Sequence, residues 1–503
     1  MCFITNNPEE LRDFDHYVSS AQGKFAYKDF VWIYGPLSPI VYGAVLKVLP
    51  HRLISVRLFS LALWAVGAAF LALIFARFYH NPKVILGATL FASGIFGYPS
   101  YSHNHVMVAV ALIGATYYLL DFFDFGAVRS LYTSFGLVLV CLFARPVLMG
   151  YGILAAWMGF FLAGKNNFDK PKQFSLCIAA TLVSLMVFYA FYGTYLGTAF
   201  FPRSWAVLEA KSYPNLHYLF PRPDFRSADW LGSFFKQVRG ALETAIFYGH
   251  YFILPTVMLT ITGVIKFRSD LRAGFLCAVM AWMASFDILH YGFSDPMMEP
   301  VMAVRGQYFL PLSAVALFLL LWQTWATRPK TDPKKWAAVA VLAVVGLWSY
   351  GNYFIGLSHL VRYPINAYRF PILAGIGTSP ERSAIFQAAT FVNSLCGSDD
   401  SVVLPQYDPG IARILTCPDV FHEDAYAFTR MPWYVLQPGE SPYIAQGNMT
   451  NGEVIERRLA EFKPRFFITH LASNYDEKCR GLFWQTKDFG SGTNGRRVCW
   501  RAK

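Results

Sequence analysis

The sequence has few charged residues. Only 15% of its 503 residues are charged, whereas 55% are hydrophobic, and soluble domains usually carry about 25% charged residues. This balance excludes an ordinary soluble enzyme and indicates a membrane protein. The net charge of +12 is explained by basic loops on one side of a membrane, so it requires no nucleic-acid partner.

The sequence also lacks a signal peptide of the usual form, in which a basic start, an apolar stretch and a small-residue cleavage site follow one another. No internal repeat or low-complexity segment is visible. A polar N-terminus expected outside the cytoplasm, with nothing to carry it there, leaves two alternatives. Either a first span precedes this reading of the chain, or the short head crosses the membrane together with the span that begins at residue 53.

Long apolar windows are abundant instead. A segment of about 17 to 25 apolar residues can cross a bilayer as a helix, and ten such windows are present. They lie near residues 53–79, 84–99, 105–123, 131–144, 147–163, 173–198, 246–266, 273–290, 307–326 and 336–356. The apolar stretch at 38–49 is too short to assign. We therefore expect an α-helical polytopic membrane protein, with an external catalytic loop region and short helices in residues 1–50 and a transmembrane bundle in residues 51–356.

Basic residues in the short loops give the orientation. Lys and Arg are retained on the cytoplasmic side of a membrane, and here they follow the first, fifth, seventh and ninth windows. The head, the loops near 100–104, 199–245 and 291–306, and everything after 356 are therefore expected outside the cytoplasm. This pattern predicts a protein of the bacterial inner (plasma) membrane with an external C-terminal domain.

The polar tail, residues 357–503, is predicted to be an α/β domain. The stretch PERSAIFQAATFVNSL follows a Ser-Pro start signal and has helical spacing, SVVLPQ is a β-branched run, and GEVIERRLAEFKPRFFITHL suggests a helix, a turn and a strand. Four of the eight cysteines lie here, namely Cys396, Cys417, Cys479 and Cys499. In an external domain they predict two disulfides, with three pairings open and nearest-neighbour pairing as our guess; four free thiols are the alternative.

The head contains the stretch DFDHYVSSAQGKFAYKDFVWIYGPLSPIVYG, which places acids and aromatic residues ahead of the first span. Pro8 suits the first position of a helix that we expect to end near Gln22. At about 100° per residue, Asp15 borders the apolar face of this helix, whereas Asp13 lies nearly opposite, toward water. A carboxylate at that boundary could act as a general base, and a solvated acid or a partner of the helix dipole is the alternative.

Further motifs follow one another in a fixed order along the chain. They are Asp13-x-Asp15-x-Tyr17, Tyr27-x-Asp29-Phe30, Tyr34-Gly35-Pro36-Leu37, Arg57 at a span start, Ala144-Arg145-Pro146, and the run AVRGQYFLP from Ala303 to Pro311. In this order they resemble the polytopic GT-C glycosyltransferases, in particular the protein-mannosyltransferase-like and aminoarabinose-transferase-like enzymes. The resemblance covers residues 13 to about 356. It implies a GT-C-like bundle, to which a soluble external tail is often attached.

The resemblance implies inverting transfer of a sugar from a polyprenyl-phosphate donor to an acceptor at the external face. An aspartate of the first loop would deprotonate the acceptor. Either Asp13 or Asp15 aligns with that aspartate, and we choose Asp15 from the helical face; the family's Asp-Glu pair is absent here. A cation would stabilise the leaving phosphate, for which Arg305 is the first candidate and Lys28 the second, although both residues also suit anchoring at lipid headgroups.

Other residues are weaker candidates for substrate contacts. Asp29 matches the family's second loop aspartate, although pinning the loop before the Gly-Pro turn is its commoner role. Tyr34 could stack on a sugar, although an interfacial aromatic belt is the commoner explanation. Tyr308 belongs to the same late motif as Arg305. His103 and His105 could contact phosphate, or bind a divalent metal together with Glu299, but a divalent site needs three or four ligands. Metal dependence therefore stays open.

Two other functions remain as alternatives. A transporter would need interrupted spans and ionisable residues within the membrane, and few charges fall inside the windows. A non-catalytic scaffold with an external binding domain would not need a pocket at Asp15. No motif tells which sugar moves, or whether the acceptor beside the membrane lipid is a glycan, a lipid or a protein.

Overall fold

The structure is a computed structural model of the full chain, and it describes part of that chain. The described residues are 8–26, 32, 35–96, 103–144, 310–327, 329–341, 343, 380–404, 414–418, 459–471, 479–481, 483, 485–490 and 495–502, together with four single helical positions between 179 and 190. The chain divides into two compact units. One contains Phe59–Phe191 and Lys211–Ile355, and the other contains Cys2–Leu58, Tyr192–Ala210 and Gly356–Lys503.

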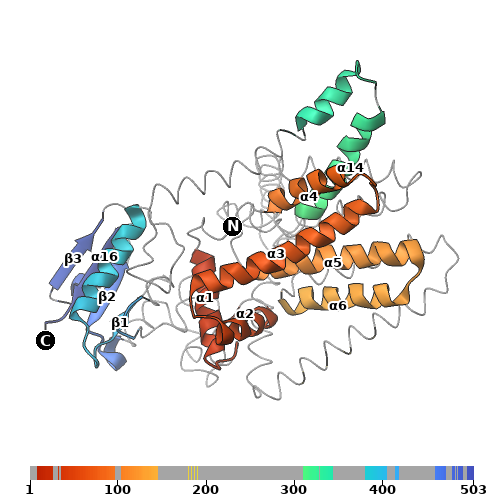
Figure 1. The fold of residues 1–503 in the computed structure, drawn as a ribbon. Coiled ribbons are helices and arrows are strands. Elements are labelled where there is room, and N and C mark those ends of the chain that lie inside the picture. Colours follow the sequence, from red (N-terminus) through yellow and green to blue (C-terminus); the bar gives the residue numbers. More distant parts are fainter. Residues whose placement is uncertain are drawn as a thin grey trace, which may run out of the picture. The chain divides into compact units, whose positions relative to one another are not determined.

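The described part of the first unit is a bundle of apolar helices (Figure 1). The helices are α3 (Leu53–Ala76), whose first residues belong to the second unit, α4 (Pro82–Phe96), α5 (His103–Phe125), α6 (Val128–Ala144) and α14 (Leu310–Thr327). They coincide with five of the predicted windows, and the helical residues 333–341 overlap the start of the last window, 336–356. The windows at 147–163, 246–266 and 273–290, and most of 173–198, lie outside the described residues.

Two of the described helices are long and apolar enough to cross a membrane, Leu53–Ala76 and His105–Phe122. Leu61, Val66 and Leu73 of α3 are exposed. Outward-facing apolar side chains on a helix that is apolar all round are expected where lipid is the surrounding solvent.

Close contacts hold the bundle together. α5 and α6 lie side by side, and α14 packs against α4. Gly114 of α5 allows this approach, because a Cβ atom there would stand 2.9 Å from a methyl group of Leu137 in α6. Phe318 of α14 has its ring centroid 5.6 Å from that of Phe75 and 5.9 Å from that of Phe91.

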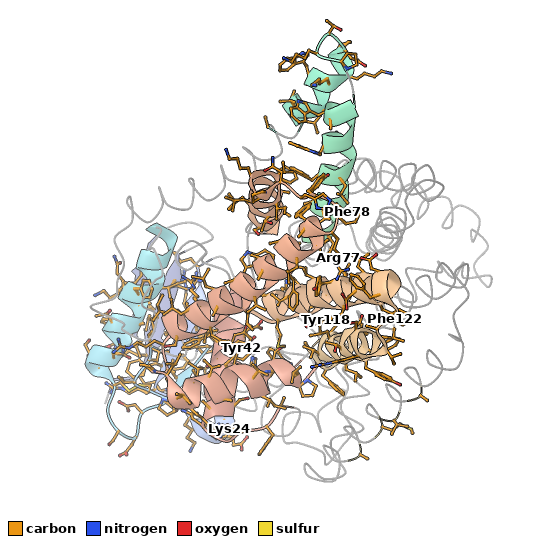
Figure 2. The ribbon with its side chains drawn as sticks, turned by 45° about the vertical axis from the view of Figure 1, so that its right-hand side comes forward. Lys24, Tyr42, Arg77, Phe78, Tyr118 and Phe122 are labelled. Carbon is orange, nitrogen blue, oxygen red and sulfur yellow. A yellow bond between two sulfur atoms is a disulfide. The ribbon has the colours of Figure 1, made fainter. Side chains whose placement is uncertain are left out.

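An ion cluster joins the ends of three helices. Arg77, just after α3, donates hydrogen bonds of 2.6 Å to Asp121 and 2.5 Å to Asp124 near the end of α5. Ser130, at the start of α6, donates a hydrogen bond to Asp121. The guanidinium also lies 4.8 Å from the ring centroid of Tyr117. Figure 2 shows Arg77 directed toward α5.

Helix α14 also contacts this end of the bundle. Tyr79, two residues after Arg77, has its ring centroid 6.1 Å from that of Trp322 near the end of α14. The ends of α3, α5 and α14 and the start of α6 therefore share one end of the bundle. This arrangement agrees with the alternation of loops expected from the basic residues.

The C-terminal part contains a small α/β fold. The sheet has the order β1-β2-β4-β3, with β1 (Val402–Val403) parallel to β2 (Phe466–His470), and β4 (Arg496–Trp500) antiparallel to both β2 and β3 (Gln485–Phe489). The predicted helix is present as α16 (Pro380–Leu395), and the predicted strands are present as β1 and β2.

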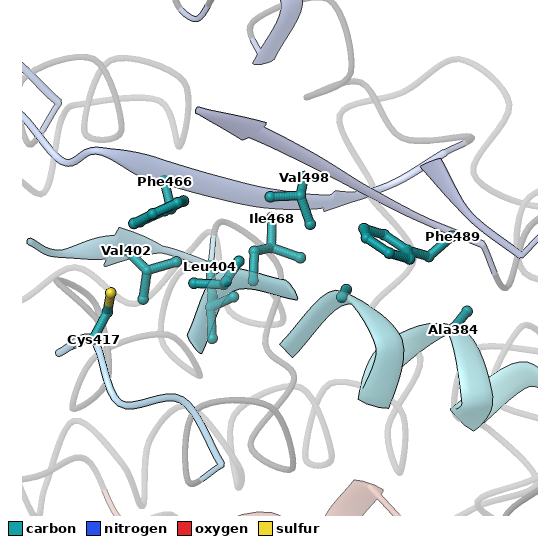
Figure 3. Packing of buried hydrophobic residues seen from close by; sticks show 10 residues of the cluster. Ala384, Val402, Leu404, Cys417, Phe466, Ile468, Phe489 and Val498 are labelled. Carbon is teal, nitrogen blue, oxygen red and sulfur yellow. The ribbon is translucent and has the colours of Figure 1, made fainter. Parts of the chain in front are cut away.

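Helix α16 covers one face of this sheet (Figure 3). Its apolar residues Ala384, Ala388 and Val392 pack on Ile468 of β2 and Val498 of β4. They stand at i, i+4 and i+8, which is the spacing of one helix face. The apolar residues at this spacing form one face of the helix, and that face packs on the sheet.

A short segment containing Cys479 and Phe483 covers the other face. A disulfide links Cys479 to Cys499 of β4, and Phe483 packs on Phe467 with ring centroids 5.6 Å apart. A second disulfide links Cys396, just after α16, to Cys417. This is the nearest-neighbour pairing guessed from the sequence.

Candidate active site

The candidate site begins with two helices of the second unit. α1 (Pro8–Ala21) matches the helix predicted for the head, and it packs against α2 (Leu37–Val48). Gly43 is required at the crossing, because a Cβ atom there would stand 2.7 Å from Cβ of Ser20. Tyr17 and Tyr42 stack beside it, with ring centroids 4.7 Å apart and planes 15° apart. Both tyrosine side chains are fully buried.

Trp32 extends this aromatic packing to the loop between the helices. Its indole Nε1 donates a 2.8 Å hydrogen bond to the carbonyl oxygen of Gly35, just ahead of α2. Its ring lies edge-on to His16, with centroids 5.3 Å apart, and 6.1 Å from the ring of Tyr17. Trp32 is 1% exposed, so its ring is enclosed by protein.

Both acids of the predicted site are buried. Asp13 is 0% exposed and Asp15 is 3% exposed. The expectation that Asp13 points to water was therefore wrong. The helical repeat places Asp13 on the same face as His16 and Tyr17, which carries the contacts to Trp32 and α2. The apolar periodicity of α1 does not reveal this second packed face. The signal in the sequence is that His16 and Tyr17 stand three and four residues after Asp13, which places all three on one side of a helix.

The two acids therefore have different surroundings along the same helix. Residues two apart on a helix project about 200° from each other. Asp15 shares its face with Val18 and Ser19, away from the packing of Tyr17 on Tyr42. The choice of Asp15 as the acid that meets a substrate stays a prediction.

The other predicted residues are distributed between the described and undescribed parts. His103 begins α5, and His105 is buried in the same helix at 2% exposure; both belong to the other compact unit. Arg57, part of the head motifs, is 4% exposed in the first turns of α3. Lys28, Asp29, Tyr34, Glu299, Arg305 and Tyr308 lie outside the described residues.

A metal centre has no support in the described part of the chain. Among these residues, no group of three His, Cys, Asp or Glu side chains could hold a metal ion. Glu299 lies outside this search, so the suggested set of His103, His105 and Glu299 stays a prediction.

The chain is similar to two solved structures. It is similar to the apo crystal structure of ArnT from Cupriavidus metallidurans, with a TM-score of 0.53, 12% sequence identity, and 99% of this chain and 93% of that chain covered. The crystal structure of ArnT from Cupriavidus metallidurans bound to undecaprenyl phosphate gives a TM-score of 0.55, again with 12% identity, over 99% of this chain and 94% of that one. No protein-family model matches the sequence, and no curated protein matches it significantly.

ArnT is an aminoarabinose transferase and a GT-C enzyme. A similarity at 12% sequence identity shows a shared fold and does not show a shared reaction. The match confirms the GT-C-like fold that the resemblance in the motifs implies. The chain therefore has a GT-C-like fold, a polytopic helical membrane bundle followed by a C-terminal domain.

Proposed function

We propose that this protein is a membrane glycosyltransferase that moves a sugar from a polyprenyl-phosphate donor to an acceptor at the external face of the membrane. The observation that supports it most is the pair of buried carboxylates, Asp13 and Asp15, on a helix that precedes a GT-C-like bundle. One of the two similar crystal structures contains bound undecaprenyl phosphate, and this supports a polyprenyl-phosphate donor.

The proposed chemistry is a single displacement with inversion. Asp15 accepts the proton of the acceptor hydroxyl, whose oxygen then forms a bond to the anomeric carbon of the sugar. The bond between that carbon and the phosphate oxygen breaks, and its electron pair leaves with the lipid phosphate. A fixed cation stabilises the charge that develops on this leaving group; Arg305 and Lys28 are the proposed cations.

Asp15 is preferred over Asp13 because of the packing of α1. Both acids are buried, but Asp13 shares its helix face with His16 and Tyr17, which contact Trp32, whereas Asp15 projects from the other side of the helix. Because the two acids project to opposite sides of the helix, one substrate hydroxyl can meet only one of them. The proposal therefore predicts unequal effects when the two acids are replaced.

The test is sugar transfer in membranes that contain the full-length protein, with a panel of radiolabelled polyprenyl-phosphate sugars. The variants are Asp13→Asn and Asp15→Asn, with Asp399→Asn, an exposed acid of the tail, as the control at matched expression. We expect Asp15→Asn to lower the transfer rate about 10²- to 10⁴-fold, the usual contribution of a general base, and the control to keep the wild-type rate.

Two other outcomes would change the proposal. A loss confined to Asp13→Asn would move the general base to that residue. A wild-type protein that transfers none of these sugars would contradict the proposal and favour a transporter or a scaffold.

The tail is proposed to lie outside the cytoplasm and to select the acceptor, because appended domains often carry specificity. Full-length protein and a variant that ends at residue 369 would be compared on a set of acceptors. Unchanged acceptor preference in the shortened protein would contradict this role.

A further inference from the structure

We infer that α2 (Leu37–Val48) lies in the surface of the lipid bilayer, with its outward face against phospholipid, beside the point where α3 begins. Such contact is independent of the proposed sugar transfer. It also assigns the apolar stretch at 38–49, which is too short to be a span. The twelve residues of α2 rise about 18 Å as a helix, whereas the apolar core of a bilayer is about 30 Å thick.

Helix α2 is apolar on two opposite faces. Its buried face packs on α1 through Tyr42 and Gly43. The exposed residues of the helix recur at i, i+4, i+7 and i+8, the spacing of one helix face, and they are Ile40, Ala44, Lys47 and Val48. Ile40 is 42% exposed and Val48 is 85% exposed. The outward face of α2 is therefore mainly apolar along its whole length.

This apolar face continues toward the first span. Leu49, directly after α2, is 41% exposed, and α3 begins four residues later at Leu53. Leu58, in the second turn of α3, is 51% exposed as well. Among the described helices, the main packing partner of α2 is α1, so α2 does not run along α3 as the second span of a hairpin would. It stands at the level where α3 begins.

Basic residues border the apolar face at that level. Lys47 lies at one edge of the face, and His51 and Arg52 follow in the turn before α3; all three are exposed, and no acid stands between Leu37 and Arg52. Such a helix suits a bilayer surface, where apolar side chains reach the acyl chains and cations reach the phosphate headgroups. A protein partner fits less well, because Lys is depleted at protein interfaces.

The place of α1 follows from the same arrangement. Helix α1 packs on the face of α2 that is directed away from lipid, and the axes of packed helices are about 8–10 Å apart. It therefore lies one helix layer above the lipid, on the aqueous side of α2. The two carboxylates of α1 are held close to the membrane surface but outside its apolar core.

Nitroxide labels on α2 measure this contact directly in the full-length protein. The four cysteines outside the tail are first replaced with Ala, namely Cys2, Cys141, Cys177 and Cys277. Single labels are then attached after Ile40→Cys, Ala44→Cys or Val48→Cys. The control is Gln22→Cys, at an exposed position just after α1. The protein is placed in nanodiscs of phosphatidylethanolamine and phosphatidylglycerol.

On the outward face, each label should collide more often with oxygen, which concentrates in lipid, than with a water-soluble nickel complex. The label at position 22 should show the reverse. More frequent collision with nickel on α2 would place the face in water and overturn the inference. A lipid signal at position 22 as strong as that at position 48 would also overturn it, because the whole head would then be immersed.

Coverage of the face by protein is recognised in the same experiment. Infrequent collision with both reagents would mean that protein covers the labels, which contradicts the inference. Spectral broadening that disappears on dilution with unlabelled protein would identify the cover as a second copy of this chain. Sugar transfer is not measured, so an inactive wild type would remove the proposed function and leave the contact of α2 with lipid standing.

Photolabelling of the unmodified protein covers the case in which the labelled variants do not fold. Nanodiscs containing a phospholipid with a diazirine in its acyl chain are irradiated, and the adducts are located by mass spectrometry. We expect adducts in residues 37–49 and in α3, which is long and apolar enough to cross a membrane, and none in α16 of the tail. Adducts in α3 without any in residues 37–49 would refute the inference.

Discussion

Gly43 of α2 lies against Ser20 of α1 so closely that a Cβ atom at position 43 would stand 2.7 Å from Cβ of Ser20. This contact sets how near the two helices of the head approach each other. It therefore also sets the distance at which Tyr17 and Tyr42 stack.

Gly43→Ala should destabilise the protein, because the added methyl group overlaps Ser20 and must push the helices apart. Overpacking of this kind costs about 1–3 kcal/mol. Thermal unfolding of the detergent-purified protein would show it as a lower Tm. Gly87→Ala in α4 is the matched control, since nothing lies within 4 Å of a Cβ atom there; equal Tm values for both variants would contradict this account.

Arg77→Ala should also destabilise the bundle, because it leaves Asp121 and Asp124 close together without their cation. The side chain of Arg77 is 10% exposed, and those of the two acids are 22% and 15% exposed. Removal of one partner from a buried ion pair costs about 3–5 kcal/mol, and the remaining exposure places the expected loss near the lower end.

The check is again the Tm of the full-length protein. Lys83→Ala, which removes an exposed cation from the same end of the bundle, should leave it nearly unchanged. Restoration of stability by combining Arg77→Ala with Asp121→Asn and Asp124→Asn would identify the uncompensated acids as the cause. A Tm equal to that of the wild type for Arg77→Ala alone would show that the cluster is dispensable.

The two disulfides should contribute strongly to the stability of the tail. They join cysteines 21 and 20 residues apart, and closure of loops of this size is worth about 3 kcal/mol each in the chain-entropy account. Replacement of both members of a pair with Ala should lower the unfolding free energy by about that amount. A reductant should destabilise the wild type but not a variant in which all four tail cysteines are Ala; an unaffected wild type would refute the prediction.

The ion pair of Asp488 and Arg497 should make the tail sensitive to acid. Arg497 donates two hydrogen bonds of 2.6 Å to the carboxylate. These bonds lower the pKa of Asp488 despite its partial burial, and the charges of Arg497 and Arg480 lower it further. A carboxyl whose pKa is lower in the folded than in the unfolded state adds stability above the unfolded value, about 3.9, and loses it as the pH falls through the folded value.

Wild type and Asp488→Asn should therefore differ in stability at pH 6 and converge as the pH falls below about 4. The effect is modest, since Asp488 is 45% exposed and solvent screens the pair. Thermal unfolding across this pH range checks it, with the exposed Asp399→Asn as the control. A difference that stays constant with pH would mean that the loss has another origin.

The helices were predictable because their side chains repeat in ways that the sequence displays. α3 and α5 appear as apolar windows, and α16 as apolar residues four apart. β1 and β2 were predicted from β-branched and aromatic residues.

β3 and β4 were not predicted, because QTKDF and RRVCW carry charges where strands usually carry apolar residues. In the folded sheet, Arg497 of β4 faces Asp488 of β3 as its direct cross-strand neighbour, and such opposite-charge pairs stabilise sheets. Asp13 was misplaced for a related reason, since a periodicity argument ranks polar residues as outward whatever later packs on them.

The order of the strands in the tail has a consequence for biosynthesis. β4 lies between β2 and β3, and it is made after both. The sheet cannot assemble until residue 500 has left the ribosome, and Cys479 must wait as a thiol for Cys499 to arrive. By then the described helices α3 to α6 and α14 have been synthesised, so the disulfide between Cys479 and Cys499 closes only after those helices have been made.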